Sequence, residues 1–190
     1  MPCLSMPLPI LVTGPSRSGK SEWAEHLASK SHQPVIYIAT GKENAADADW
    51  QNRIQQHRNR RPSHWKTVCV DQNLTDTLTT LPSATCALVD SLGGWVANTL
   101  ELSPEQWQTQ QRTLINFVQE LQPGPGLIIF VAEETGWGVI PAYALGRIFR
   151  DRLGALTRQL GGLCGQVYLV TGGYALDLRR WGEPLPPSSQ

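Results

Sequence analysis

Hydrophobic residues along this chain occur in two kinds of pattern. Short apolar runs predict buried β-strands, and longer stretches in which apolar residues recur every three or four positions predict helices that cover a sheet. The predicted strands are residues 10–12, 35–39, 68–70, 87–89, 127–131 and 167–170. The predicted helices are residues 21–30, 47 to about 60, 104 to about 121, and a long helix with Pro141 in its first turn.

The last predicted helix has an apolar stripe that is expected to face the sheet. The stripe consists of Leu145, Ile148, Phe149, Leu153, Leu156 and Leu160. Because strands and helices alternate, we predict one α/β domain over residues 10–182, with a mainly parallel sheet flanked by helices. Residues 1–9 are predicted to be a short N-terminal extension, and the proline- and serine-rich residues 183–190 a flexible tail.

The junction between the first strand and the first helix has the pattern G-x-x-x-x-G-K-[ST], which is typical of loops that bind a nucleoside triphosphate. Its residues, all predicted to contact the nucleotide, are Gly14, Pro15, Ser16, Arg17, Ser18, Gly19, Lys20 and Ser21. The two glycines permit backbone angles that let successive N–H groups point at phosphate oxygens beside a helix N-terminus. Lys20 is predicted to be catalytic at the β- and γ-phosphates, and Ser21 to bind Mg²⁺. The sequence therefore predicts a P-loop NTPase fold.

Asp90 closes the apolar run of the fourth predicted strand. In P-loop enzymes a carboxylate at the end of a neighbouring strand binds the same Mg²⁺ as the loop hydroxyl, which is the Walker-B role. We therefore predict that Asp90 binds the metal and the nucleotide. The alternative is an ordinary strand-end carboxylate that caps a turn.

A basic segment follows the second strand, with four arginines within residues 53–61 of a chain whose net charge is zero. The charge predicts a polyanion nearby. Within this segment His57 shares a helical stripe with Trp50 and Ile54. A neutral imidazole among cations could attack a phosphorus atom and form a phosphoramidate, which is the first half of a nucleotidyl transfer. A structural or solvated histidine is the alternative.

The composition limits the partners of this chain. Lys and Arg together number 16, as do Asp and Glu, so there is no global field to attract nucleic acid or an anionic membrane. No apolar stretch approaches the ~18 residues that predict a membrane span. The four cysteines are far apart and form no C-x-x-C pair, so neither a zinc site nor a disulfide framework is expected, and a reducing cytoplasm fits best.

Taken together, these segments resemble one family, the bifunctional adenosylcobinamide kinase/adenosylcobinamide-phosphate guanylyltransferases of cobalamin biosynthesis. The resemblance spans residues 10 to about 178. Its most specific block is Arg53-Ile54 with His57, followed by Arg61-Pro62 and Trp65. The other matching positions are the P-loop, Tyr37-Ile38-Ala39-Thr40, Leu88-Val89-Asp90, Trp95, Asn98, Glu134, Gly136, Gly138, Pro141, Phe149-Arg150-Asp151 and residues 167–170.

The resemblance implies two reactions at one nucleotide site. ATP or GTP phosphorylates adenosylcobinamide, and GMP is then transferred from GTP to the new phosphate, giving adenosylcobinamide-GDP and pyrophosphate. It also implies that His57 carries the guanylyl group and that Thr40, Arg53 and Arg61 contact the nucleotide. A sheet similar to that of RecA-type domains and a homo-oligomer, with a trimer as the expected form, are implied as well.

This chain departs from the family pattern at three positions. Cys69 replaces a frequent acidic residue, Glu133 replaces the usual Asn before the family's Glu, and Thr157 replaces an Asn of the long helix. None of these changes touches the P-loop, His57 or Asp90, so the core chemistry is expected to be intact.

Two other functions stay open at this point. One is a P-loop small-molecule kinase with a single activity, for which His57 would be dispensable. The other is a RecA-like ATPase that depends on nucleic acid and uses the basic segment to bind phosphates. Zero net charge and the lack of a basic stripe interleaved with aromatic residues disfavour the second.

Overall fold

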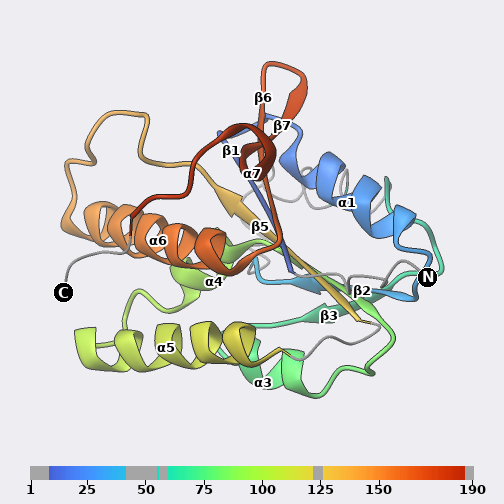
Figure 1. Ribbon diagram of the computed structural model, residues 1–190. Helices are drawn as coiled ribbons and strands as arrows, with labels where there is room; N and C mark the ends of the chain where they lie inside the picture. The colour runs from blue at the N-terminus through green and yellow to red at the C-terminus, as the bar shows by residue number, and fades with distance from the viewer. Residues whose placement is uncertain (1–8, 42–54, 56–59, 122–125, 187–190) are drawn as a thin grey trace.

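A seven-stranded sheet with the strand order β3-β2-β4-β5-β1-β6-β7 forms the centre of the computed structural model, which describes residues 9–41, 55, 60–121 and 126–186 (Figure 1). The strands are β1 Ile10–Gly14, β2 Val35–Ala39, β3 Lys66–Cys69, β4 Cys86–Asp90, β5 Leu127–Glu133, β6 Gln166–Thr171 and β7 Tyr174–Asp177. The helices are α1 Lys20–Lys30, α3 Leu74–Thr79, α4 Leu92–Asn98, α5 Pro104–Glu120, α6 Ala144–Leu163 and α7 Leu178–Trp181.

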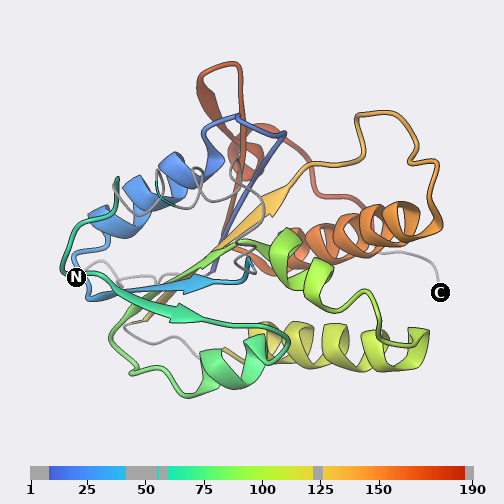
Figure 2. The same cartoon turned by 180° about the vertical axis from the view of Figure 1, so that it is seen from behind.

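Every strand pair is parallel except β6–β7, which confirms the predicted mainly parallel sheet. Helix α1 lies on one side of the sheet, and α3, α5 and α6 lie on the other (Figures 1 and 2). The buried residues accordingly form two clusters, one on each side. Since both faces are covered, the central strands are apolar over most of their length, and this is why short apolar runs identified them.

The small elements at the ends of strands were not expected from the sequence. Helix α4 follows β4 directly, and Ser91 caps it by accepting a hydrogen bond from the Gly94 N–H. Its two glycines, Gly93 and Gly94, weaken the local helix signal. The hairpin between β6 and β7 turns at Gly172 and Gly173, both with positive φ, and a Gly-Gly pair of this kind is a sequence signal for a two-residue turn.

Helix α6 corrects two predictions about the longest helix. It begins at Ala144, so Pro141 lies in the preceding connection, where its carbonyl accepts a hydrogen bond from Arg147 Nη1 at 3.0 Å. The C-terminal part of the predicted stripe is buried, but Leu145 and Ile148 are exposed. Leu145 and Ile148 are exposed because the N-terminal end of α6 extends beyond the sheet (Figures 1 and 2).

Other predictions fall partly outside the described residues. The helix expected over residues 47 to about 60 is described only at Gln55 and Arg60, which are both helical. The third strand covers Lys66–Cys69 instead of residues 68–70. Residues 183–186 have no regular secondary structure, and the predicted division into extension, domain and tail stays a prediction. Within the described residues, no helix combines the length and the apolar character that a membrane crossing needs.

Candidate functional site

The predicted P-loop lies between β1 and α1, at the carboxyl edge of the sheet. Gly19 has φ +90°, a left-handed conformation that suits glycine, and its carbonyl accepts the Trp23 N–H at 2.9 Å. Arg17 has φ 60°, in the same region. A side chain at Gly14 would overlap the backbone carbonyl of Val170. The loop therefore folds tightly between α1 and β6, and both glycines of the motif are needed for this shape.

Lys20 and Ser18 place donors inside the loop. Lys20 is only 9% exposed, and its Nζ donates to the Pro15 carbonyl at 3.2 Å, so the ammonium group lies back over the loop. Ser18 Oγ is buried and has no hydrogen-bond partner among the described residues. A phosphate oxygen in this loop could accept hydrogen bonds from both side chains.

Ser21 and Asp90 are 69 positions apart in sequence and meet beside the loop. Ser21 Oγ donates to Asp90 Oδ1 at 3.3 Å. Asp90 ends β4, as predicted, and its carboxylate and the Ser21 hydroxyl are hard oxygen donors of the kind that Mg²⁺ takes together with phosphate oxygens. The two predicted metal ligands are thus adjacent and chemically suited to the ion.

Tyr37 is a neighbour of Asp90 that sequence reasoning did not single out as a site residue. The phenol of this buried β2 residue donates to Asp90 Oδ2 at 2.9 Å. Burial, together with the nearby Asp90 carboxylate, raises the pKa of Tyr37 well above its ordinary value. The phenol therefore remains a hydrogen-bond donor at physiological pH.

Thr40 is tied to the backbone that follows Asp90. Its side chain is 1% exposed, and its hydroxyl donates to the Ser91 carbonyl at 2.6 Å and accepts the Ser91 N–H at 2.9 Å. Asn98 Nδ2 in turn donates to the Thr40 carbonyl at 2.8 Å. These bonds hold the end of β4 in place, and a direct contact between Thr40 and the nucleotide stays a prediction.

The described end of the basic segment packs against α1 and β2. The guanidinium carbon of Arg61 lies 3.5 Å from the centroid of the Tyr37 ring. Arg60 pairs with Glu22 at 2.6 Å and with Glu25 at 3.4 Å. Arg53 and His57 lie outside the described residues, so their predicted contacts stay predictions.

Glu133 lies beside the P-loop, paired in register with Gly14. Its Oε1 accepts a hydrogen bond from Ser91 Oγ at 2.5 Å, whereas its Oε2 is buried and has no hydrogen-bond partner among the described residues. A side chain at Gly93 would overlap Oε2. Burial raises the pKa of Glu133, and the Ser91 hydrogen bond and the Lys20 charge oppose the rise. The sequence marked Glu133 as a departure, but only the strand order shows that it lies next to the loop.

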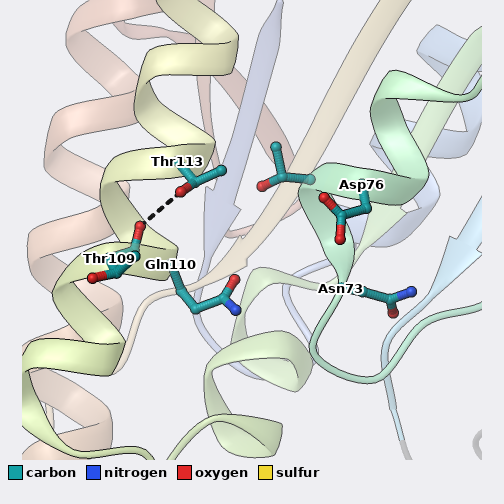
Figure 3. Close-up of a pocket in the computed structure, with 6 residues that line it drawn as sticks. Asn73, Asp76, Thr109, Gln110 and Thr113 are labelled. Carbon is teal, nitrogen blue, oxygen red and sulfur yellow. Dashed lines mark hydrogen bonds between the residues drawn. The ribbon is translucent and has the colours of Figure 1, made fainter.

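Two surface hollows lie away from the P-loop. One, of about 190 Å³, lies between α3 and α5, and the side chains that line it are polar (Figure 3). They are Asn73, Thr75, Asp76, Thr109, Gln110 and Thr113. The other, of about 360 Å³, lies near the C-terminal end of α1 and the start of β2 and includes His32 and His64. Neither hollow includes a predicted site residue.

Comparison with known proteins adds to this geometry. The family described as "Cobinamide kinase / cobinamide phosphate guanyltransferase" (CobU) matches residues 10–178. Among curated proteins, the bifunctional adenosylcobalamin biosynthesis protein CobP of Pseudomonas aeruginosa is 39% identical over 177 residues, which is 92% of this chain and 98% of that protein. Its counterpart CobU of Salmonella typhimurium is 36% identical over 183 residues, covering 90% of this chain and 99% of that protein.

Solved structures show the same fold at much lower identity. The Pyrococcus horikoshii protein PH0250 has a TM-score of 0.55 at 7% identity, with 92% of this chain and 87% of that chain covered. An ATPase of a bacterial type III secretion system has a TM-score of 0.55 at 8% identity, with 93% of this chain and 53% of that chain covered. These likenesses confirm the predicted RecA-like P-loop fold and carry no further functional argument.

Proposed function

Because this chain belongs to the cobinamide kinase / cobinamide phosphate guanylyltransferase family, we propose that one nucleotide site, built on residues 14–21, serves both of its reactions. The chain phosphorylates adenosylcobinamide and transfers a guanylyl group to adenosylcobinamide phosphate. We further propose that His57 carries the guanylyl group between GTP and the corrinoid phosphate. The observation that supports a single site most directly is the meeting of Ser21 with Asp90 beside Lys20.

The kinase reaction uses the loop at the γ-phosphate. The corrinoid hydroxyl attacks the γ-phosphorus of ATP or GTP, and negative charge develops on the bridging oxygen of the leaving diphosphate. Lys20, with its buried ammonium group, stabilises this charge together with the donors of the loop. Such preorganised donors act without reorganisation at the moment of transfer.

The guanylyl transfer uses the same bound triphosphate at a different phosphorus. The His57 imidazole attacks the α-phosphorus of GTP and displaces pyrophosphate, and a phosphate oxygen of adenosylcobinamide phosphate then attacks the phosphoramidate and releases the imidazole. Arg61, four residues after His57 and stacked on Tyr37 beside Asp90, supports a cationic group near this step. The family resemblance of the Arg53 to Trp65 block is the other support.

Ser21 and Asp90 would hold Mg²⁺, which when bound neutralises phosphate charge and orients the triphosphate. The fit rests on the chemistry of the donors, since the adjacent Ser21 hydroxyl and Asp90 carboxylate are hard oxygen ligands of the kind that Mg²⁺ takes together with phosphate and water oxygens. Removal of Mg²⁺ is therefore expected to suppress both reactions.

We propose that the protein works as a homo-oligomer in the cytoplasm, with a trimer as the expected form. Large apolar side chains are exposed in the connection before α6 and in its first turns, which is unusual for a surface that only meets water. They are Trp137, Val139, Ile140, Tyr143, Leu145 and Ile148. The described cysteines Cys69, Cys86 and Cys164 are free thiols, which is in keeping with a reducing compartment.

Labelling with GTP that carries a radioactive α-phosphate tests the role of His57. We expect the protein to retain an acid-labile, hydroxylamine-sensitive label, as a phosphoramidate should be, and His57→Ala to lose it while still converting adenosylcobinamide to its phosphate. His26→Ala, which changes an exposed histidine of α1, serves as the control and should keep the label.

An undiminished label in His57→Ala would contradict the guanylyl-histidine step. Analysis of the products formed from adenosylcobinamide and GTP distinguishes the proposed enzyme from a kinase with a single activity. A kinase with one activity yields adenosylcobinamide phosphate alone, and the proposed enzyme yields adenosylcobinamide-GDP and pyrophosphate.

A further inference from the structure

We propose that Tyr37, held by Arg61, is a positioning residue that fixes the Asp90 carboxylate for Mg²⁺. This inference rests on the proposed metal role of Asp90. It assigns a function to Tyr37, and it gives Arg61 a role besides the nucleotide contact that the family resemblance implies.

The two oxygens of Asp90 have different partners. Oδ1 faces Ser21 Oγ at 3.3 Å, a long hydrogen bond, and Oδ2 accepts the Tyr37 phenol at 2.9 Å, close to the usual length. A metal bound between Ser21 and Asp90 would use Oδ1 and replace the longer bond. The Tyr37 bond lies on the other oxygen, so it would persist and hold the carboxylate in the orientation that presents Oδ1.

Tyr37 has little freedom to move. It lies in the interior of β2, is 4% exposed, and pairs with Leu88 of β4, two residues before Asp90. Strands β2 and β4 are therefore joined by this side-chain hydrogen bond in addition to their backbone hydrogen bonds. Hydrogen-bonding partners of this kind, one step removed from a metal, typically change metal affinity about 10- to 100-fold when they are lost.

Arg61 packs over one face of the Tyr37 ring. The guanidinium carbon is 3.5 Å from the ring centroid, within the distance at which a cation is attracted to an aromatic face. Arg60, the preceding residue, pairs with Glu22 and Glu25 of α1, the helix that begins with Lys20 and Ser21. The chain at residues 60–61 thus contacts both the P-loop helix and the partner of the metal carboxylate.

Binding of α,β-methylene-GTP, measured by calorimetry with Mg²⁺ and again with EDTA, tests the proposal. This analogue cannot be cleaved at the α-phosphorus, so binding is separated from turnover. For Tyr37→Phe we expect the Kd with Mg²⁺ to rise about tenfold or more, and the Kd in EDTA to stay within about twofold. Tyr174→Phe, which changes an exposed tyrosine of β7, should alter neither value.

A double-mutant cycle tests the part of Arg61. Arg61→Ala is expected to weaken Mg²⁺-dependent binding in the wild-type background and to add nothing in the Tyr37→Phe background, because its effect passes through the phenol. If Arg61 contacts the nucleotide directly instead, Arg61→Ala will weaken binding equally in both backgrounds and also in EDTA.

Three results would overturn the proposal or its premise, and they are distinguishable. Unchanged Mg²⁺-dependent binding in Tyr37→Phe, with a normal melting temperature, refutes the positioning role. Equal weakening with Mg²⁺ and with EDTA shows a general structural effect and refutes it as well. If Asp90→Asn keeps full Mg²⁺-dependent binding, the proposed metal role of Asp90 fails, whatever Tyr37→Phe does.

Discussion

At the scale of single residues, Asp90 and Glu133 show how neighbours decide what a carboxylate can do. Both end parallel strands, β4 and β5, at the same edge of the sheet. Asp90 accepts hydrogen bonds at both oxygens, from Ser21 and Tyr37. Glu133 has one oxygen bonded to a hydroxyl and the other buried without a partner among the described residues. Asp90 is thus prepared for a cation, whereas the charge of Glu133 is a cost to the folded state.

This cost predicts a pH dependence of stability for Glu133→Gln. The folded-state pKa is raised by burial, so the folded protein holds this proton more tightly than the unfolded chain does. Protonated Glu133 therefore stabilises the fold at pH values below the ordinary pKa of a glutamate. This stabilisation is lost as the pH rises through the raised pKa of the folded protein. We expect the melting temperature of Glu133→Gln, relative to wild type, to increase between about pH 4.5 and pH 8.

The measurement is made in EDTA without nucleotide, so that ligand binding does not contribute. Glu101→Gln, which removes an exposed carboxylate, is measured alongside as the surface control. A Glu133→Gln difference that is flat or decreases over the same range would show that the carboxylate is not destabilised by its surroundings.

At the scale of the elements, the glycines of α4 and α6 lie in different surroundings. In α4, a side chain at Gly93 would overlap Glu133 and one at Gly94 would overlap Thr40, so this short helix needs both glycines to approach β5 and the end of β2. In α6, a side chain at Gly154 would meet nothing within 4 Å. Sequence alone treats all three as helix-weakening residues.

The glycines of these helices therefore predict opposite effects of alanine. Gly93→Ala should destabilise the protein by about 1–3 kcal/mol, because the packed carboxylate cannot move without a loss of contacts. Gly154→Ala should stabilise it by about 0.5–1 kcal/mol, because it restricts the unfolded chain at an open helical position. Urea unfolding followed by circular dichroism measures both. A stabilising Gly93→Ala would mean that α4 is not packed tightly against Glu133.

At the scale of the whole molecule, an exposed apolar surface lies on the connection between β5 and α6. This connection leaves the carboxyl edge of the sheet, where the P-loop and Asp90 lie, and projects away from the sheet (Figure 1). Val139 is 93% exposed and Ile140 64% exposed. Side chains of this kind on a loop favour burial against another molecule, which supports the proposed homo-oligomer.

Sedimentation equilibrium tests the contribution of this surface to assembly. We expect the wild-type protein to sediment with a mass above that of the monomer, and Ile140→Asp to shift the mass toward the monomer, because a buried unpaired charge opposes association. Leu185→Asp introduces the same charge at an exposed leucine outside this connection and should leave the mass unchanged. A wild-type protein that sediments as a monomer at micromolar concentrations would refute the proposed assembly.

Much of the fold was predictable because its signals are local. The six predicted strands all appear in the sheet, since buried parallel strands are short apolar runs. The P-loop was predictable because its glycines meet backbone requirements within eight consecutive residues. Asp90 was predictable as a strand-end carboxylate. By contrast, the exposure of Leu145 and Ile148 was not, because periodicity shows which residues share a helix face and not whether that face meets the sheet.

The amino-acid sequence by itself determined the nucleotide loop, the strands and the family of this protein, because each depends on neighbouring residues or on a run of matching positions. Only the tertiary structure decided which side chains meet at the site. Tyr37 reaches Asp90 because β2 lies beside β4, and Glu133 reaches the P-loop because β5 lies between β4 and β1. Strand order is set by packing over the whole chain, and a local pattern of polar and apolar residues cannot specify it.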